Sequence, residues 1–280
     1  MNRVATHRVL RVNPRAMKFL APLLALLAPT AVSAHECWLQ PATFAPVPGP
    51  AIGLTIQVGM NFQGEPKPFS PERIAALKHF SIAGREDWTA KANNLLQLPV
   101  KFEDSGTHVV IYDNKPSLIT LEPAQFAEYL REEGLEFVLA ERERAGEAAK
   151  PGRERYRRCN KTILTADGRS DATFGIITGQ QLEIIPLDNP ADCRPGGTLR
   201  VKLLFAGQPL VEAKVRAWNR AGTNLTTLDG RTSSEGEVSF TLPVGGQWML
   251  STLRMARVTG DQDADWESTW GTLTFAIRRR

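Results

Sequence analysis

The sequence has few of the residues, and none of the short motifs, that usually carry chemistry. Its 280 residues include only three cysteines and four histidines. It contains no CxxC pair, no HExxH, no glycine-rich phosphate-binding loop and no GxSxG around a nucleophile. A hydrolase triad would have to be assembled from distant residues, and no local pattern points to one. We therefore expect a protein that binds rather than an enzyme.

Basic charge is also scarce once the N-terminus is set aside. The formal net charge is +4, but five of the 34 basic residues and none of the 30 acidic residues lie within residues 1–34. The remaining chain is close to neutral. A nucleic-acid-binding function is therefore disfavoured.

The first 34 residues have the pattern of a secretory signal peptide. A basic stretch leads to the apolar run Phe19–Ala28, and small residues at Val32–Ala34 precede a cleavage site. Met17 is an alternative start, and an uncleaved anchor is the alternative interpretation. No other stretch is apolar and long enough to span a membrane. We expect cleavage after Ala34 and a periplasmic mature protein that begins at His35.

The three cysteines, Cys37, Cys159 and Cys193, have an odd count, which leaves at least one thiol unpaired. Disulfides persist in exported proteins. We favour a bridge between Cys159 and Cys193. The other two pairings, and no bridge at all, stay open.

Apolar alternation predicts a mainly β protein. Residues 52–58 alternate as a half-buried strand, and further short strands are expected at 79–82, 100–102 and 108–112. Residues 35–118 are thus predicted to form a first β-sandwich. About seven short strands with regular turns predict a second, immunoglobulin-like or prealbumin-like β-sandwich over residues 171–280.

Between them, residues 119–170 are predicted as a short helical connecting segment. Glu122-Pro123 opens one helix, Gly134 ends it, and a second helix follows. Cys159 would follow a basic helical stretch. The Glu/Arg mixture at 141–158 suggests either a site for an acidic ligand or a solvated helix face with near-neighbour ion pairs, and we favour the solvated face.

The mature N-terminus offers the sharpest candidate site. The α-amine and imidazole of His35 can chelate one metal ion, and nitrogen donors suit Ni(II) or Cu(II). His108 is the first choice for a third ligand, His79 the second, and a reduced Cys37 could add a thiolate. In the alternative interpretation, His35 is an inert terminus and His108 forms structural hydrogen bonds.

A second candidate is the aromatic cluster DWESTW at Asp265–Trp270. Trp266 and Trp270 could line a carbohydrate or metal pocket. We favour a structural role, in which they cover the end of the last sandwich.

Several segments resemble an exported bacterial family of unknown function, and the resemblance covers essentially the whole mature chain. They are HECWLQP at 35–41, NFQGEP at 61–66, the stretch FAEYLREEGLEFVLAERERAGE followed by KPGRERYRRC, LEIIPLDNP followed by PGGTL, and DWESTWGTLTF at 265–275. This family is similar to periplasmic proteins associated with nickel and cobalt uptake. The resemblance implies a non-enzymatic role in binding or delivering a metal, with His35 matching the family's histidine at the mature start.

One position departs from the family pattern. A histidine often precedes the methionine in the strand before DWES, whereas this sequence has Arg254 before Met255. Arginine has no acceptor lone pair and would repel a cation. The departure weakens the metal interpretation.

Two main hypotheses follow. The first is a periplasmic protein that binds nickel or cobalt, with copper as the alternative, through His35 with His108 or His79, and assists an inner-membrane metal transporter. The second is a metal-free structural or adaptor module that binds an envelope protein or a polysaccharide. A copper-dependent oxidase is a minor third.

Overall fold

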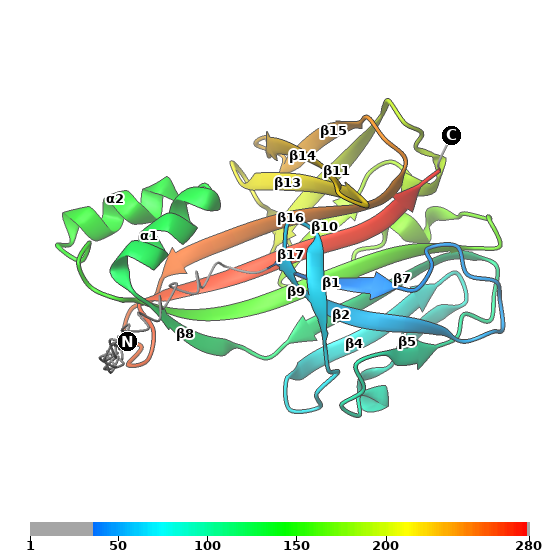
Figure 1. The fold of residues 1–280 in the computed structure, drawn as a ribbon, viewed down its shortest axis with the longest axis horizontal. Helices are drawn as coiled ribbons and strands as arrows, with labels where there is room; N and C mark the ends of the chain where they lie inside the picture. The colour runs from blue at the N-terminus through cyan, green and yellow to red at the C-terminus, as the bar shows by residue number, and fades with distance from the viewer. Residues whose placement is uncertain (1–35, 279–280) are drawn as a thin grey trace, which may run out of the picture. The chain divides into compact units, whose positions relative to one another are not determined.

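The computed structural model describes residues 36–278, and these residues are built around one large mixed sheet (Figure 1). Its eight-strand path has the order β14-β13-β16-β17-β9-β7-β4-β5, and β8 pairs with β9 beside it. The strands are β4 (Ile74–Ser81), β5 (Gly84–Asp87), β7 (Gly106–Asn114), β8 (Ser117–Leu121), β9 (Gly152–Ala166), β13 (Lys214–Ala221), β14 (Asn224–Arg231), β16 (Gly246–Arg257) and β17 (Trp266–Ile277).

Two four-stranded antiparallel sheets pack against the large sheet. The first contains β1 (Glu36–Pro41), β2 (Ile52–Met60), β3 (Gln63–Lys67) and β6 (Leu98–Val100). The second contains β10 (Leu182–Pro186), β11 (Gly197–Phe205), β12 (Gln208–Pro209) and β15 (Glu237–Leu242). The predicted mainly β fold class, with its β-sandwich packing, is confirmed.

Strand β7 shows how the layers are arranged. Its Val109 and Ile111 belong to the core that includes β11, whereas Val110 and Tyr112 belong to the core that includes β1 and β2. Successive side chains of a strand point to opposite faces, so the two small sheets cover opposite faces of the large one. The two sandwiches therefore share their central sheet. That sheet takes strands from all three predicted segments, across the boundaries expected at 118/119 and 170/171.

The predicted helical segment 119–170 contains the longest strand of the described chain. Residues 152–166 form β9, which pairs in parallel with β17 and antiparallel with β7 and β8. The basic helical stretch expected before Cys159 was therefore wrong. Alternation explains the strand, because Glu154, Tyr156 and Arg158 line a cavity on one face while Lys161 reaches a partner sheet on the other.

The two predicted helices are confirmed as α1 (Pro123–Glu132) and α2 (Glu136–Arg144). Proline is tolerated in the first turn of α1 because its missing N–H would have no helical partner there. Gly134, at φ 71°, turns the chain between the helices. The helices bury Phe126, Tyr129 and Val138 against β16 and β17, in a third core.

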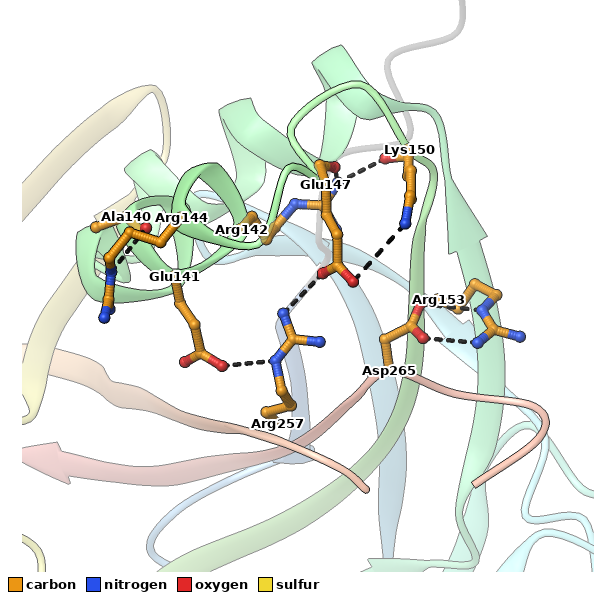
Figure 2. Close-up of polar contacts among 9 residues, drawn as sticks. All are labelled: Ala140, Glu141, Arg142, Arg144, Glu147, Lys150, Arg153, Arg257 and Asp265. Atoms are coloured by element: carbon orange, nitrogen blue, oxygen red, sulfur yellow. Dashed lines mark hydrogen bonds and ion pairs between the residues drawn. The ribbon is translucent and has the colours of Figure 1, made fainter. Parts of the chain in front are cut away.

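The charged residues around α2 hold this layer in place (Figure 2). Arg257 of β16 binds Glu141 at 2.5 Å and Glu147 at 2.7 Å, and Arg153 of β9 binds Asp265 at 2.6 Å. Of these ion pairs around α2, only Lys150–Glu147 joins residues that are close in the sequence. The Glu/Arg mixture thus joins different elements, where a solvated helix face was expected.

All three cysteines are free and buried. The favoured Cys159–Cys193 bridge is therefore wrong. Cys159 lies on β9 and Cys193 directly follows a short 3-10 turn, Pro190–Asp192, before β11. Within residues 36–278, no helix has the length and apolarity needed to cross a membrane.

Candidate binding cavity

A cavity of about 520 Å³ lies between the first small sheet and the helical layer. Both cover the same face of the large sheet, and the cavity occupies the part of that face between them. Its wall is formed by Cys37, Ile56, Val58, Lys67, Pro68, Ser70, Arg73, Tyr112, Asn114, Ile119, Leu121, Tyr129, Glu154, Tyr156, Arg158 and Trp270. Side chains from eight elements, far apart in sequence, thus converge on one space.

The α1 side of the cavity is aromatic and contains a buried acid. The Tyr129 and Trp270 rings are stacked, with centroids 6.0 Å apart. Glu154 is 3% exposed and accepts hydrogen bonds at Oε1 from the hydroxyls of Tyr129 (3.2 Å) and Ser268. Burial raises the pKa of Glu154 to about 7, against the lowering effect of these hydrogen bonds and of Arg158. The carboxyl group therefore holds its proton over a large part of the neutral range.

Basic groups and a phenol define the β7 side. Lys67, Arg73 and Arg158 line the cavity, and the Arg158 guanidinium lies over the Tyr156 ring at 5.0 Å. Tyr112 is 5% exposed, and burial raises the pKa of its phenol, while Arg158 and Arg73 act in the opposite direction. Both guanidinium groups therefore favour the ionised form of the phenol, while burial favours the neutral form.

His79 and His108, two predicted metal ligands, are brought together by the pairing of β4 with β7. Nε2 of His79 lies 2.9 Å from Nδ1 of His108. Their other ring nitrogens contact Glu86 Oε1 at 3.2 Å and the Asp104 carbonyl at 2.9 Å. Every imidazole nitrogen thus already has a partner, and a metal could bind only by displacing one of these hydrogen bonds.

The histidine pair is also enclosed by aromatic rings. His79 stacks on Trp88, and Phe102 packs against both histidines. Burial lowers the pKa of His79 to about 4 and lowers that of His108. Both rings are therefore neutral at pH 7, as expected for structural hydrogen bonding in a core.

His35, the anchor of the predicted metal site, lies outside the described residues. Among residues 36–278, no group of three or more His, Cys, Asp and Glu is arranged to hold a metal ion. Cys37, the soft ligand considered from sequence, lines the cavity and accepts a hydrogen bond from Asn160 at 3.2 Å. Burial raises the pKa of its thiol, so the thiolate is disfavoured.

A smaller pocket of about 150 Å³ borders the start of β1 and is rich in acid. Glu36, Glu132 and Glu133 line it together with Met60, Asn61, Arg216 and Trp218. Burial raises the pKa of Glu36 and of Glu133 to about 7. The negative charge of Glu132 raises both pKa values further, and Glu133 also raises that of Glu36. Residues Glu36 and Cys37 thus point into different pockets, as alternation along a strand requires.

The aromatic cluster near the C-terminus does not form an open groove. Trp266 is fully buried beneath the helices, with Arg257 over its ring at 4.5 Å, and Trp270 is 5% exposed. Trp270 is nevertheless a wall of the cavity. Arg254 lies over Phe205 at 3.9 Å, toward the second small sheet and away from the cavity.

Sequence comparison assigns the chain to a family. Residues 32–256 match a family described as a domain of unknown function (DUF4198). The chain belongs to this family. The resemblance to a family of unknown function is confirmed, while the association of this DUF4198 protein with nickel or cobalt uptake stays a prediction. No curated protein matches the sequence.

Three solved structures that match this DUF4198 chain are distant from it in sequence. A tetra-tandem repeat from the extending region of a large adhesion protein is 11% identical, with 86% of this chain and 49% of that chain covered and a TM-score of 0.19. A DUF3823 family protein from Bacteroides uniformis is 8% identical, with 88% and 100% covered and a TM-score of 0.23. Dimeric latent PorU from Porphyromonas gingivalis is 11% identical, with 92% and 21% covered and a TM-score of 0.20. The chain spans about half the length of the first of these.

Sequence reasoning singled out Trp270 and Cys37 but missed the cavity they share. Glu154, Tyr156 and Arg158 lie in RERYRRC, which was interpreted as helical. Read with a period of two, these residues fall on one face of a strand, and that pattern was the available signal. Tyr112 and Tyr129 gave no signal, because buried tyrosines are common in cores.

Proposed function

We propose that this protein is an exported, non-catalytic binding protein that takes a small molecule into the cavity between the first small sheet and the helices. The observation that carries the proposal is the composition of the wall. Aromatic and aliphatic side chains supply apolar surface, and a few polar groups of both signs converge on the same space. Small-molecule sites have this make-up and fall in the same range of volume.

Two polar groups support binding in particular. The Tyr112 hydroxyl has no hydrogen-bond partner among residues 36–278, although the side chain is 95% buried. No described residue bonds Oε2 of Glu154 either, because both of its hydrogen bonds end on Oε1. Neither atom is among the buried polar atoms that lack a partner in the described chain, so both are accessible from the cavity, where a ligand or water can bond them.

Blocking the cavity should abolish binding. In a fragment screen read by calorimetry, we expect Ile119→Trp to weaken every hit by at least about tenfold, because the indole fills space that the fragments use. Leu118→Trp is the matched control: Leu118 is adjacent on β8, is 54% exposed and does not line the cavity. A screen without hits, or hits that survive Ile119→Trp, would contradict the proposed function.

A metal-binding function at His35 is the second candidate. It is favoured by position, since His35 directly precedes Glu36 and Cys37, which border the two pockets. Glu36, Glu132 and Glu133 line the smaller pocket together and would supply oxygen donors there. In this candidate the ion is nickel or cobalt, with copper as the alternative, and the protein passes it to an inner-membrane metal transporter.

Calorimetric titration of the mature protein with Ni(II), Co(II) and Cu(II) tests this candidate. We expect one-to-one binding that is lost when one extra alanine precedes His35, because the α-amine then lies one residue away from the imidazole. His108→Gln should leave the affinity within about twofold, since both His108 nitrogens already have partners. Binding no tighter than millimolar, or unaffected by the added alanine, would rule the terminal site out.

A further inference from the structure

The chemistry of the cavity wall restricts the class of ligand. Three side chains that can carry positive charge face the cavity, Lys67, Arg73 and Arg158, against one acid, Glu154. Lys67 pairs with Glu65 at 3.5 Å, and Arg158 lies over the Tyr156 ring at 5.0 Å. Arg73, Arg158 and Tyr112 all line the cavity, and both guanidinium groups lower the pKa of the Tyr112 phenol against the effect of burial.

The opposite wall offers a donor of another kind. Oε1 of Glu154 is occupied by the Tyr129 and Ser268 hydroxyls, which leaves Oε2 for the cavity. When the carboxyl group is protonated, Oε2–H can donate to a ligand; when it is ionised, it places a negative charge in the same space. Ile119, Leu121 and Trp270 line the wall with apolar surface.

From this arrangement, and resting on the proposed function, we infer that the cavity takes a small organic anion with an apolar body, and takes it together with the proton on Glu154. The anionic group lies at Tyr112, Arg73 and Arg158, and the apolar body lies against Trp270 and Leu121. Loss of the Glu154 proton repels the ligand. The protein thus captures its ligand in mildly acidic surroundings and releases it in mildly alkaline ones.

The groups that face Glu154 are compatible with the coupling of ligand binding to its protonation. They are the Tyr129 hydroxyl from α1, the Ser268 hydroxyl from β17 and the Arg158 guanidinium on β9 itself. The other titratable side chains of the wall are Cys37, Lys67, Arg73, Tyr112 and Tyr156. Burial raises the pKa of Cys37 and of Tyr112, so neither adds a competing change of charge between pH 6 and 8.5.

Phenylacetate and its neutral isostere phenylacetamide are suitable probes, titrated calorimetrically at pH 6.0 and 8.5. We expect phenylacetate to bind at least about tenfold more weakly at pH 8.5, because the protonated fraction of Glu154, and with it the binding-competent fraction, falls by more than tenfold. In Glu154→Gln, which keeps a donor and cannot ionise, the affinity should change less than about twofold between the two pH values.

Two arginine variants test where the anionic group of the ligand binds. Arg73→Gln should weaken phenylacetate by at least about fivefold and leave phenylacetamide unchanged, whereas Arg85→Gln, an exposed arginine on β5, should affect neither.

Each outcome decides one part. Phenylacetamide binding as tightly as phenylacetate would overturn the anion assignment and leave the cavity a binding site. Equal pH dependence in the protein and in Glu154→Gln would overturn the proton link. If neither probe binds at 5 mM (roughly 3 kcal/mol of affinity), the inference falls, and the proposed function is then judged on the fragment screen with Ile119→Trp.

Discussion

Glu183→Gln is expected to lower the free energy of unfolding by about 3–5 kcal/mol. Glu183 and Lys161 form an ion pair at 2.6 Å, and both side chains are 1% exposed. The carboxylate also accepts from the backbone and hydroxyl of Thr178 and from the backbone of Gly179. An amide can replace only part of this pattern, and it leaves the Lys161 ammonium buried without a counter-charge. Burial already lowers the pKa of Lys161.

Denaturant unfolding at pH 7 gives the measurement. The exposed pair Lys202–Glu237, at 3.7 Å, supplies the control, and Glu237→Gln should cost less than about 1 kcal/mol. Adding Lys161→Met to Glu183→Gln should recover part of the loss, because the uncompensated charge is then gone. A loss below 1 kcal/mol in Glu183→Gln would mean that the pair does not hold β9 to the second small sheet.

Local patterns predicted the parts of this fold that local interactions determine. The alternation at 52–58 correctly predicted β2. Pro123 correctly marked the start of α1, and Gly134 lies just beyond its end. The parallel pairing of β9 with β17 joins residues about a hundred positions apart, which no spacing in the sequence records. The run His108–Tyr112 was interpreted as a strand of one sandwich, but it is buried on both faces and therefore belongs to two.

The candidate site, like the fold, depends on contacts between residues that are far apart in the sequence. Sequence reasoning chose histidines, because imidazole is rare here and chemically informative, and it proposed His108, or else His79, as a metal ligand beside His35. The structure places His79 and His108 side by side but bonded to each other. The cavity is assembled from β1, β2, β3, β7, β8, β9, β17 and α1, and none of its polar residues forms a recognisable motif in the sequence. Only the three-dimensional pairing supplies that information.

Glu154→Gln is expected to change stability in a pH-dependent way. Burial raises the pKa of Glu154 to about 7, from an ordinary 4.5. Between these values the folded state holds a proton that the unfolded state has released, so rising pH lowers the free energy of unfolding by up to about 1.4 kcal/mol per unit. Glutamine removes this loss. Relative to the natural protein, the variant should therefore gain about 3 kcal/mol between pH 4.5 and pH 8.5, measured by denaturant midpoints.

Other groups titrate in the same range, and the comparison cancels them because both proteins retain them. Glu36 and Glu133, each with a pKa raised to about 7, lose stability with rising pH in the same direction. His79, with its pKa lowered to about 4, acts oppositely: its contribution is lost as pH falls below 6.5. Glu128→Gln, an exposed carboxylate on α1, serves as the control. An equal loss of stability in the natural protein and in Glu154→Gln would mean that Glu154 is ionised at neutral pH, and a carboxylate there could donate no hydrogen bond to a ligand.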